Sequence, residues 1–264
     1  MLALLTGDHP QSYIQAHLHL PSLAISPSSS PFTATSHDFI LRPRKQTPTA
    51  HLRTLIGIVS PEMFDAFPRR HPGMNIWEAV GTGFNGGFVP RNRRATTKNS
   101  IGWVDVDDDE LGSGWYNLSD HEKEIRREEI RKWRVERCWE VLEALGPASW
   151  SSSHPPKSLQ CQPSAETLAF ASVHFSSISP GEQRLVLLMR ALVGRPPLVL
   201  LDEVWSGMDD GMIAAVRRYL CGDFTVDANG HEMAGIGKDQ AVVVITHWED
   251  EVPWVGEEVK KFRL

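Results

Sequence analysis

Two apolar segments near the C-terminal end of the sequence run into side chains that could do chemistry. Residues 198–201 are followed by Asp202 and Glu203, and residues 241–245 are followed two positions later by His247. At the carboxyl edge of a sheet, one carboxylate can hold Mg²⁺, a second can polarise an attacking water, and a histidine can hydrogen-bond a phosphate. Each feature alone also fits a strand that simply returns to solvent.

The segment Ile178–Gln183 has the composition of a well-defined helix start. Ser179 can cap the helix, Pro180 suits its first turn, and Glu182 completes a capping box. The small Gly181 leaves N–H groups open at the positive end of the helix dipole, where a phosphate is favoured. Taken by itself, the segment is better interpreted as an ordinary helix cap.

The order and spacing of these segments resemble those of the ATP-binding cassette (ABC) ATPases. Residues 178–183 are similar to the family's signature motif, 198–203 to its Walker B motif with the catalytic glutamate, 206–209 to its D-loop and 246–247 to its switch. All four occur in the family's order, which makes chance a poor explanation. A weaker resemblance places Ile56–Glu62 at the family's Q-loop strand.

The resemblance implies a composite site in which ATP lies between the P-loop of one cassette and the signature motif of another. The implied cofactors are ATP and Mg²⁺, and the implied partner is a second cassette in the same or a tandem chain. The implied roles are Mg²⁺ binding for Asp202, catalysis for Glu203 and His247, and ATP binding for Ser179, Gly181, Glu182 and Asp209.

The phosphate-binding P-loop of this family is missing from the sequence. No Gly-x-x-x-x-Gly-Lys-[Ser/Thr] occurs, and the nearest match at 235–238 has Glu232 for the first glycine and Asp239 for the hydroxyl. Met1–Leu5 resembles the helix that follows a P-loop in the family. We therefore expect the chain to begin just downstream of a P-loop, with one edge of its sheet incomplete.

Two further positions depart from the family's pattern. Pro61 stands where the family has its Q-loop glutamine, with Glu62 beside it as a weak substitute. Pro180 replaces the first glycine of the signature motif and removes one N–H. Whether the chain is a competent ATPase is therefore left open by its sequence.

Apolar strands that alternate with helices predict an α/β fold. The resemblance implies a P-loop NTPase-like parallel sheet with helices on both faces and an inserted helical subdomain, lacking the P-loop strand. We expect one incomplete cassette over residues 1–264: a core at 1–62 with a mobile Ser/Pro-rich insertion at 21–49, helices and loops at 63–165, and the motif-bearing core at 166–264. The expected strands are 55–59, 198–201 and 241–245, and the expected helices are 119–146, about 180–193 and about 211–220.

Composition excludes several other classes of protein. The 264 residues carry a net charge of −6, which argues against broad binding to nucleic acid, and no apolar run is long enough to span a bilayer. Cys138, Cys161 and Cys221 have neither metal-ligand nor disulfide spacing, so we expect a soluble protein in a reducing, intracellular compartment, cytoplasmic or organellar. The dinucleotide-like string Gly81–Gly86 follows a helical stretch, and the basic run Arg91–Arg94 is too short for nucleic-acid binding.

Two functional hypotheses follow from the sequence. The first is an ABC-type ATPase that binds and hydrolyses ATP in a composite site. The second is a non-catalytic partner module that offers its signature motif to another chain's ATP. Glu203 and His247 favour the first, whereas the missing P-loop and Pro61 favour the second.

Overall fold

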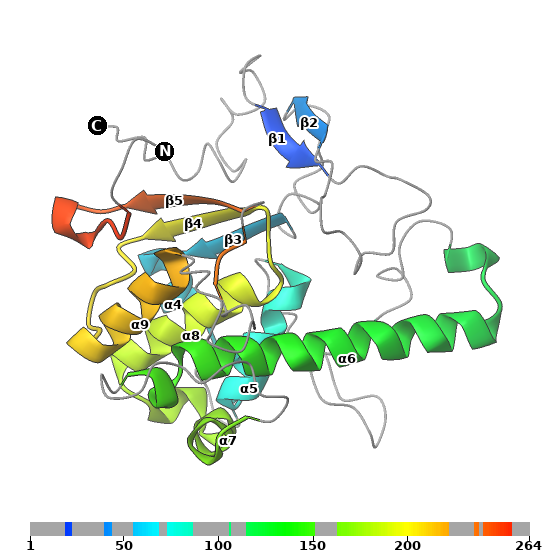
Figure 1. Ribbon diagram of the computed structural model, residues 1–264, viewed down its shortest axis with the longest axis horizontal. Coiled ribbons are helices and arrows are strands. Elements are labelled where there is room, and N and C mark those ends of the chain that lie inside the picture. The colour runs from blue at the N-terminus through cyan, green and yellow to red at the C-terminus, as the bar shows by residue number, and fades with distance from the viewer. Residues whose placement is uncertain are drawn as a thin grey trace, which may run out of the picture.

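The computed structural model describes residues 19–22, 40–43, 55–68, 73–86, 106, 115–150, 163–221, 235–237 and 240–254. Figure 1 shows their elements as ribbons. Some features expected from the sequence lie outside these residues, namely the helix at Met1–Leu5, the basic run Arg91–Arg94 and much of the Ser/Pro-rich stretch at 21–49.

Three parallel strands form the sheet that carries the candidate site. They are ordered β3-β4-β5, so that β4 lies in the middle (Figure 1). Val59 pairs with Leu201 and Asp202 pairs with Ile245, which brings the carboxyl ends of the strands to one edge. The parallel sheet of the predicted α/β fold is confirmed. The strands are β3 (Ile56–Val59), β4 (Leu198–Asp202) and β5 (Ala241–Ile245).

A separate antiparallel pair joins β1 (His19–Ser22) to β2 (Ile40–Pro43). Residues 21–22 and 40–43, which fall in the stretch expected to be a mobile insertion, are strand residues. The Ser/Pro-rich composition of the whole stretch hid the short apolar run at 39–41. Four residues on each side are enough for a ladder of backbone hydrogen bonds, because these bonds do not depend on side-chain composition.

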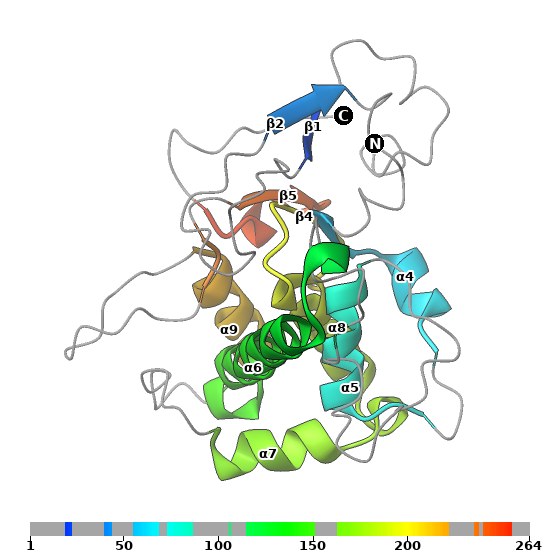
Figure 2. The ribbon, with the colours of Figure 1, turned by 90° about the vertical axis from the view of Figure 1, so that its right-hand side faces the viewer.

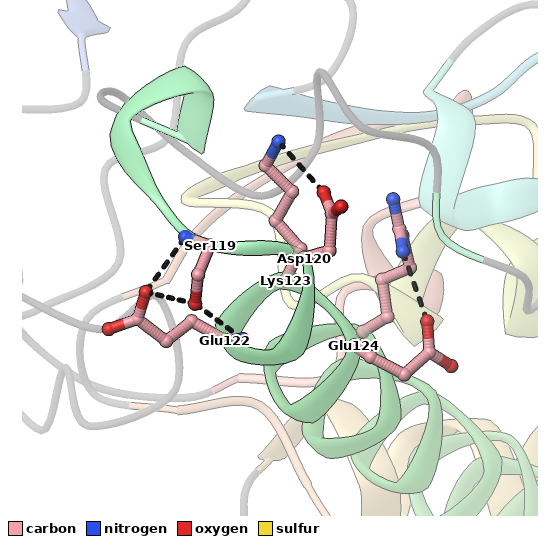
Figure 3. Close-up of polar contacts among 6 residues, drawn as sticks. Ser119, Asp120, Glu122, Lys123 and Glu124 are labelled. Carbon is pink, nitrogen blue, oxygen red and sulfur yellow. Dashed lines mark hydrogen bonds and ion pairs between the residues drawn. The ribbon is translucent and has the colours of Figure 1, made fainter.

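The longer helices begin where the sequence supplies a cap. Figure 3 shows Ser119 and Glu122 exchanging hydrogen bonds at the start of α6 (Asp120–Leu145), with Ser119 N–H donating to Glu122 Oε2 over 2.8 Å. A capping box of the same type opens α8 (Pro180–Val193). The predicted helices at 119–146 and 180–193 are confirmed. The other helices are α4 (Pro61–Ala66), α5 (Ile76–Gly81), α7 (Ala165–Ser172) and α9 (Asp210–Cys221).

Short 3₁₀ segments complete the described elements. They are η2 (Thr82–Asn85), η5 (Trp115–Asn117), η6 (Pro147–Ser149), η7 (Phe175–Ser177) and η8 (Glu249–Glu251). Within the described residues, no helix combines the length and the apolar character needed to cross a bilayer.

Helix α8 forms the centre of the hydrophobic core. It lies between the sheet and α6 in both ribbon views (Figures 1 and 2), and its residues 185–189 are at most 1% exposed. Apolar side chains of α5, α6, α9 and the sheet join it in one continuous cluster. The helices of the middle region therefore share a core with the motif-bearing region, and α8 links both to the sheet.

Replacing Gly57 with alanine is expected to destabilise the fold, because β3 and α8 meet there at backbone contact. A Cβ at Gly57 would lie 2.2 Å from the carbonyl oxygen of Ala191 and 2.9 Å from Cγ of Pro196. Overpacking of this kind costs about 1–3 kcal/mol of unfolding free energy, which urea denaturation measures. Gly194→Ala is the matched control, because its Cβ would meet nothing closer than 3.8 Å. Equal losses in the two variants would contradict the packing argument.

Candidate functional site

The ends of β4 and β5 bring Glu203 and His247 together. Because the strands are hydrogen-bonded neighbours, the N–H of Glu203 donates to the carbonyl of Ile245 over 3.1 Å. This bond places Glu203 beside the end of β5, two residues before His247. Glu203 Oε1 then lies 3.0 Å from His247 Nε2. Two residues that are 44 positions apart in the sequence thus form a side-chain pair at the carboxyl edge of the sheet.

The pair is open to solvent and rests on an unusual backbone. The side chains of Glu203 and His247 are 46% and 82% exposed, so a ligand can reach both. Glu203 has a φ of 50°, in the left-handed region that non-glycine residues rarely adopt. A residue held in such a conformation costs about 1–3 kcal/mol, and such residues cluster at functional sites. The strain marks Glu203 as a position that its neighbours must hold.

Asp202 lies one residue before Glu203 at the end of β4. Burial raises the pKa of its carboxyl group, and the charges of Glu203 and Glu62 raise it further, while His247 acts in the opposite direction. Glu62 belongs to α4, which begins directly after β3, so carboxylates from two strand ends act on one another here. Mutual repulsion of this kind suits a site that receives a divalent cation together with phosphate oxygens.

The chemistry of Asp202 fits Mg²⁺, which usually takes one or two protein carboxylates and completes its shell with water and phosphate. Among the described residues, no group of three His, Cys, Asp or Glu side chains stands close enough to hold a metal without such additional ligands. The role of Asp202 as the Mg²⁺ ligand stays a prediction, and the phosphates of a nucleotide would have to supply further ligands.

Pro61 begins α4, the helix that follows β3. Ser60 caps α4 by accepting a hydrogen bond from Met63 N–H, and Pro61 occupies the first helical position. The family's Q-loop glutamine is thus replaced by a residue that starts a helix. Glu62 is the exposed polar side chain of this turn, and a hydrogen bond from the backbone and one from Ser60 lower its pKa.

The signature-like residues Ser179 and Glu182 are used in the cap of α8. Ser179 N–H donates to Glu182 Oε2 over 2.7 Å, and Glu182 N–H donates to Ser179 Oγ over 3.3 Å. Gly181 is buried where α8 meets the loop after β4. A Cβ at this position would lie 2.0 Å from the carbonyl oxygen of Gly207. The structure therefore places these three residues together at the N-terminus of α8 and joins them to the Glu203 segment through Gly207.

Asp209, the last D-loop-like residue, caps α9. Its Oδ1 accepts a 2.8 Å hydrogen bond from Met212 N–H, and its carbonyl accepts one from Ile213 N–H. The contacts of Asp209 are therefore local, and it does not reach the pair formed by Glu203 and His247 in the described contacts. An acidic N-cap also complements the positive end of the α9 dipole.

A surface pocket of about 350 Å³ adjoins the pair and includes residues that the sequence did not single out. Its lining consists of Glu203, Trp205, Ser206, Ile213, Arg217, His247, Trp248 and Glu251. The indole of Trp248 is 71% exposed, whereas Trp205 is 5% exposed and its Nε1 has no hydrogen-bond partner. The available signal was their place beside predicted motifs: Trp205 directly precedes the D-loop-like residues 206–209, and Trp248 directly follows the switch-like residues 246–247. Arg217 comes from the middle of α9 and carried none.

Substituting Asp202 with asparagine is expected to raise the melting temperature of the unliganded chain slightly at pH 7. Because the folded pKa is raised, ionisation of Asp202 opposes folding. The penalty is absent below the unfolded pKa, near 3.8, and is complete once the pH has risen through the folded pKa. Thermal melts in EDTA that start near pH 3.8 and run to pH 8 should show the gain appear as the pH rises and then level off. Asp65→Asn, on the exposed side of α4, is the control, and a loss of stability at pH 7 in Asp202→Asn would contradict the expectation.

Sequence comparisons relate part of this chain to ATP-binding proteins of ABC transporters. It is 38% identical over 78 residues to the uncharacterized ABC transporter ATP-binding protein C323.04 of Schizosaccharomyces pombe, a match that covers 30% of this chain and 14% of that protein. It is 34% identical over 85 residues to ModF of Escherichia coli, covering 31% and 17%, and 32% identical over 83 residues to the thiamine import protein ThiQ of Rhizobium meliloti, covering 31% and 30%. The matches thus span less than a third of each relative.

Two further comparisons complete this picture. No protein-family model matches the chain. A solved structure of the ATP-binding cassette MJ0796, a dimer in a post-hydrolysis state bound to ADP and Pi, superposes with a TM-score of 0.38 at 19% identity and covers 81% of this chain and 62% of that one.

Proposed function

We propose, on the basis of this relationship to ABC ATP-binding proteins, that the chain binds and hydrolyses ATP in a composite site completed by a second cassette. The observation that carries the proposal is the 3.0 Å contact between Glu203 and His247. The two side chains follow neighbouring strands and are open to solvent. Asp202 stands next to it with a carboxylate whose environment favours a cation. The three side chains supply the types of group that phosphoryl transfer to water requires.

Each residue has a distinct role in the proposed reaction. Glu203 accepts a proton from a water molecule as the water oxygen bonds to the γ-phosphorus, and the bond from that phosphorus to the bridging oxygen of ADP breaks. His247 orients the Glu203 carboxylate through their contact and offers a hydrogen bond to the γ-phosphate. Asp202 holds Mg²⁺, which, when bound, neutralises charge on the phosphate oxygens.

The N-terminus of α8 is the proposed surface for the ATP of the second cassette. Ser179 is exposed at the end of a helix of 14 residues, whose dipole favours a phosphate. Gly181 and Glu182 belong to the first turn of this helix, where Glu182 takes part in the cap. Asp209 caps the start of α9. We place all four on the composite interface, in line with the resemblance of their segments to the family's signature motif and D-loop.

A second candidate function is that of a partner module that contacts another chain's ATP without hydrolysing its own. It is favoured by Pro61, which begins α4 where the family has a metal-contacting glutamine, and by the missing P-loop motif. In that case the exposed end of α8 would carry the function, and the pair of Glu203 and His247 would be an inherited feature. Both functions fit a reducing intracellular setting, and Cys138 and Cys221 are free thiols.

Titration of Mg·ATP into the purified chain separates the two functions. Binding by the monomer, measured by isothermal titration calorimetry and weakened in Asp202→Asn, would support the ATPase and eliminate the partner module. Absence of binding by the monomer, followed by binding once a cassette with an intact P-loop is added, would support the partner module. Glu128→Gln, an exposed position of α6, serves as the control for nonspecific effects of charge.

A further inference from the structure

We propose that the signature-like helix α8 holds the Glu203 carboxylate in place within the same chain, and that Arg184 is the positioning residue that does so. The catalytic role of Glu203 rests on the proposed function, whereas the contacts between α8 and the turn at 206–207 do not depend on it. These contacts connect the exposed end of α8, where a second cassette's nucleotide would dock, to the general base of this chain. Occupancy of that surface would thereby be transmitted to Glu203.

The turn that follows Glu203 has a strained backbone. Glu203 has a φ of 50° and Gly207 a φ of 79°, so the chain reverses through two left-handed positions. Its internal hydrogen bonds run from Ser206 N–H to the carbonyl of Glu203 over 3.4 Å and from Met208 N–H to the carbonyl of Trp205 over 3.1 Å. The first of these is long for an N–H···O bond. A strained turn with a weak first bond needs support from outside.

Arg184 supplies that support. Its Nη1 donates to the carbonyl oxygen of Ser206 over 2.6 Å, a charge-assisted hydrogen bond. The guanidinium carbon also lies 4.8 Å from the ring centroid of Phe64 in α4, so that the cation is held between an aromatic face and the turn. Arg184 belongs to the first turns of α8, on the same end of the helix as Ser179.

Gly181 provides the second connection between α8 and the turn. A Cβ at Gly181 would lie 2.0 Å from the carbonyl oxygen of Gly207, so the backbone of α8 is in direct contact with the backbone of the turn. A displacement at the start of α8 must therefore move the turn as well. The capping box ties Ser179 to Glu182 at this helix end. A displacement of Ser179 is therefore expected to displace Gly181 and Arg184 as well.

The far end of the same turn is fixed to the sheet. Glu203 N–H is bonded to Ile245, and the Glu203 side chain contacts His247. The carboxylate is thus held by β5 on one side and by α8, through the turn, on the other. Trp205 lies in the middle of the turn, is 5% exposed and lines the pocket with Glu203, so its indole is a natural reporter of the position of the turn.

The test compares Arg184→Met with Arg184→Lys in the full chain, without nucleotide. The indole N–H signal of Trp205 is followed by two-dimensional ¹H–¹⁵N NMR and assigned by its loss in Trp205→Phe. We expect this signal to shift in Arg184→Met and to stay near its original position in Arg184→Lys, which keeps a cationic donor. Lys132→Met is the control, since it removes an exposed ion pair with Glu136 on α6 and should leave the signal unchanged.

An unshifted Trp205 signal in folded Arg184→Met would overturn the proposal. Should Arg184→Met fail to fold, Phe64→Leu removes the aromatic support of Arg184 and is judged by the same signal. Where the chain hydrolyses ATP, kcat of Arg184→Met should fall by up to roughly a hundredfold with KM unchanged, since misplacement of a reacting group by about 1 Å has that effect. A shifted Trp205 signal in a chain that neither binds nor hydrolyses ATP would refute the proposed function and leave the positioning role standing.

Discussion

Replacing Arg137 with methionine is expected to lower the free energy of unfolding by about 3–5 kcal/mol, the usual effect of removing one partner from a buried ion pair. The side chain of Arg137 is 2% exposed, and its Nη1 lies 2.5 Å from Glu140 Oε1. Its Nη2 donates to Tyr219 Oη over 2.6 Å and to the carbonyl of Leu192, and its Nε donates to the carbonyl of Val193. One guanidinium therefore ties α6 to α9 and to the end of α8.

The large effect follows from what the substitution leaves behind. Glu140, whose side chain is 16% exposed, would lose the cation at 2.5 Å and keep the more distant Arg195 at 3.6 Å. Two carbonyl oxygens at the end of α8 would also lose a buried donor, which costs more than the net value of the bonds themselves. Burial raises the pKa of Tyr219, so its hydroxyl is neutral at pH 7 and cannot replace the missing charge interaction.

Urea denaturation of three variants measures this network. Lys132→Met removes an ion pair with Glu136 in which both side chains are exposed, and it should change the free energy of unfolding by no more than about 1 kcal/mol. Tyr219→Phe removes one hydrogen bond and should cost about 1–2 kcal/mol. If Arg137→Met costs no more than Lys132→Met, the buried network does not stabilise the fold.

Arg137 also shows which parts of the fold the sequence could not reveal. In the helical pattern of α6 an arginine belongs to the solvent side, whereas here it enters the core because Tyr219 and two helix-end carbonyls meet it there. Arg190 is a similar case: it is 3% exposed and donates to Thr82 Oγ1 over 2.7 Å. Such burial depends on partners 82 and 108 residues away, which no local pattern encodes.

Local signals were sufficient for the elements themselves. The caps at Ser119 and Ser179 predicted the starts of α6 and α8, and the continuous apolar runs predicted β4 and β5. Caps and apolar runs act between near neighbours in the sequence, so they can be read without the fold. The short strand β2 was missed because its apolar run is surrounded by Ser and Pro.

The candidate site was predictable in its residues but only partly in its geometry. Asp202, Glu203 and His247 were identified from their positions after apolar runs, and the order β3-β4-β5 then decides that Glu203 and His247 meet. Strand order follows from packing across the whole sheet rather than from either segment. The contacts from Arg184 and Gly181 to the turn at 206–207 depend in the same way on how α8 lies against the sheet.

Replacing Glu203 with glutamine is expected to reduce kcat for ATP hydrolysis by roughly 10²–10⁴-fold, the usual contribution of a general base. Glutamine has the same shape and can keep a hydrogen bond to His247, but it cannot take a proton from water at neutral pH. The charge of Glu203 also raises the pKa of Asp202, so its removal should make Asp202 easier to ionise and leave Mg·ATP binding intact or stronger.

The two effects should therefore separate in one variant. Turnover is measured in the purified protein mixed with a second cassette, and Mg·ATP binding is measured in the same preparation. Glu128→Gln, an exposed carboxylate of α6, controls for the loss of one negative charge and should keep normal turnover. If Glu203→Gln lowers binding and turnover in parallel, Glu203 acts on nucleotide affinity rather than on the water. Glu203→Gln removes the carboxylate that His247 contacts and preserves its shape. If turnover is unchanged in this variant, the general base therefore lies elsewhere.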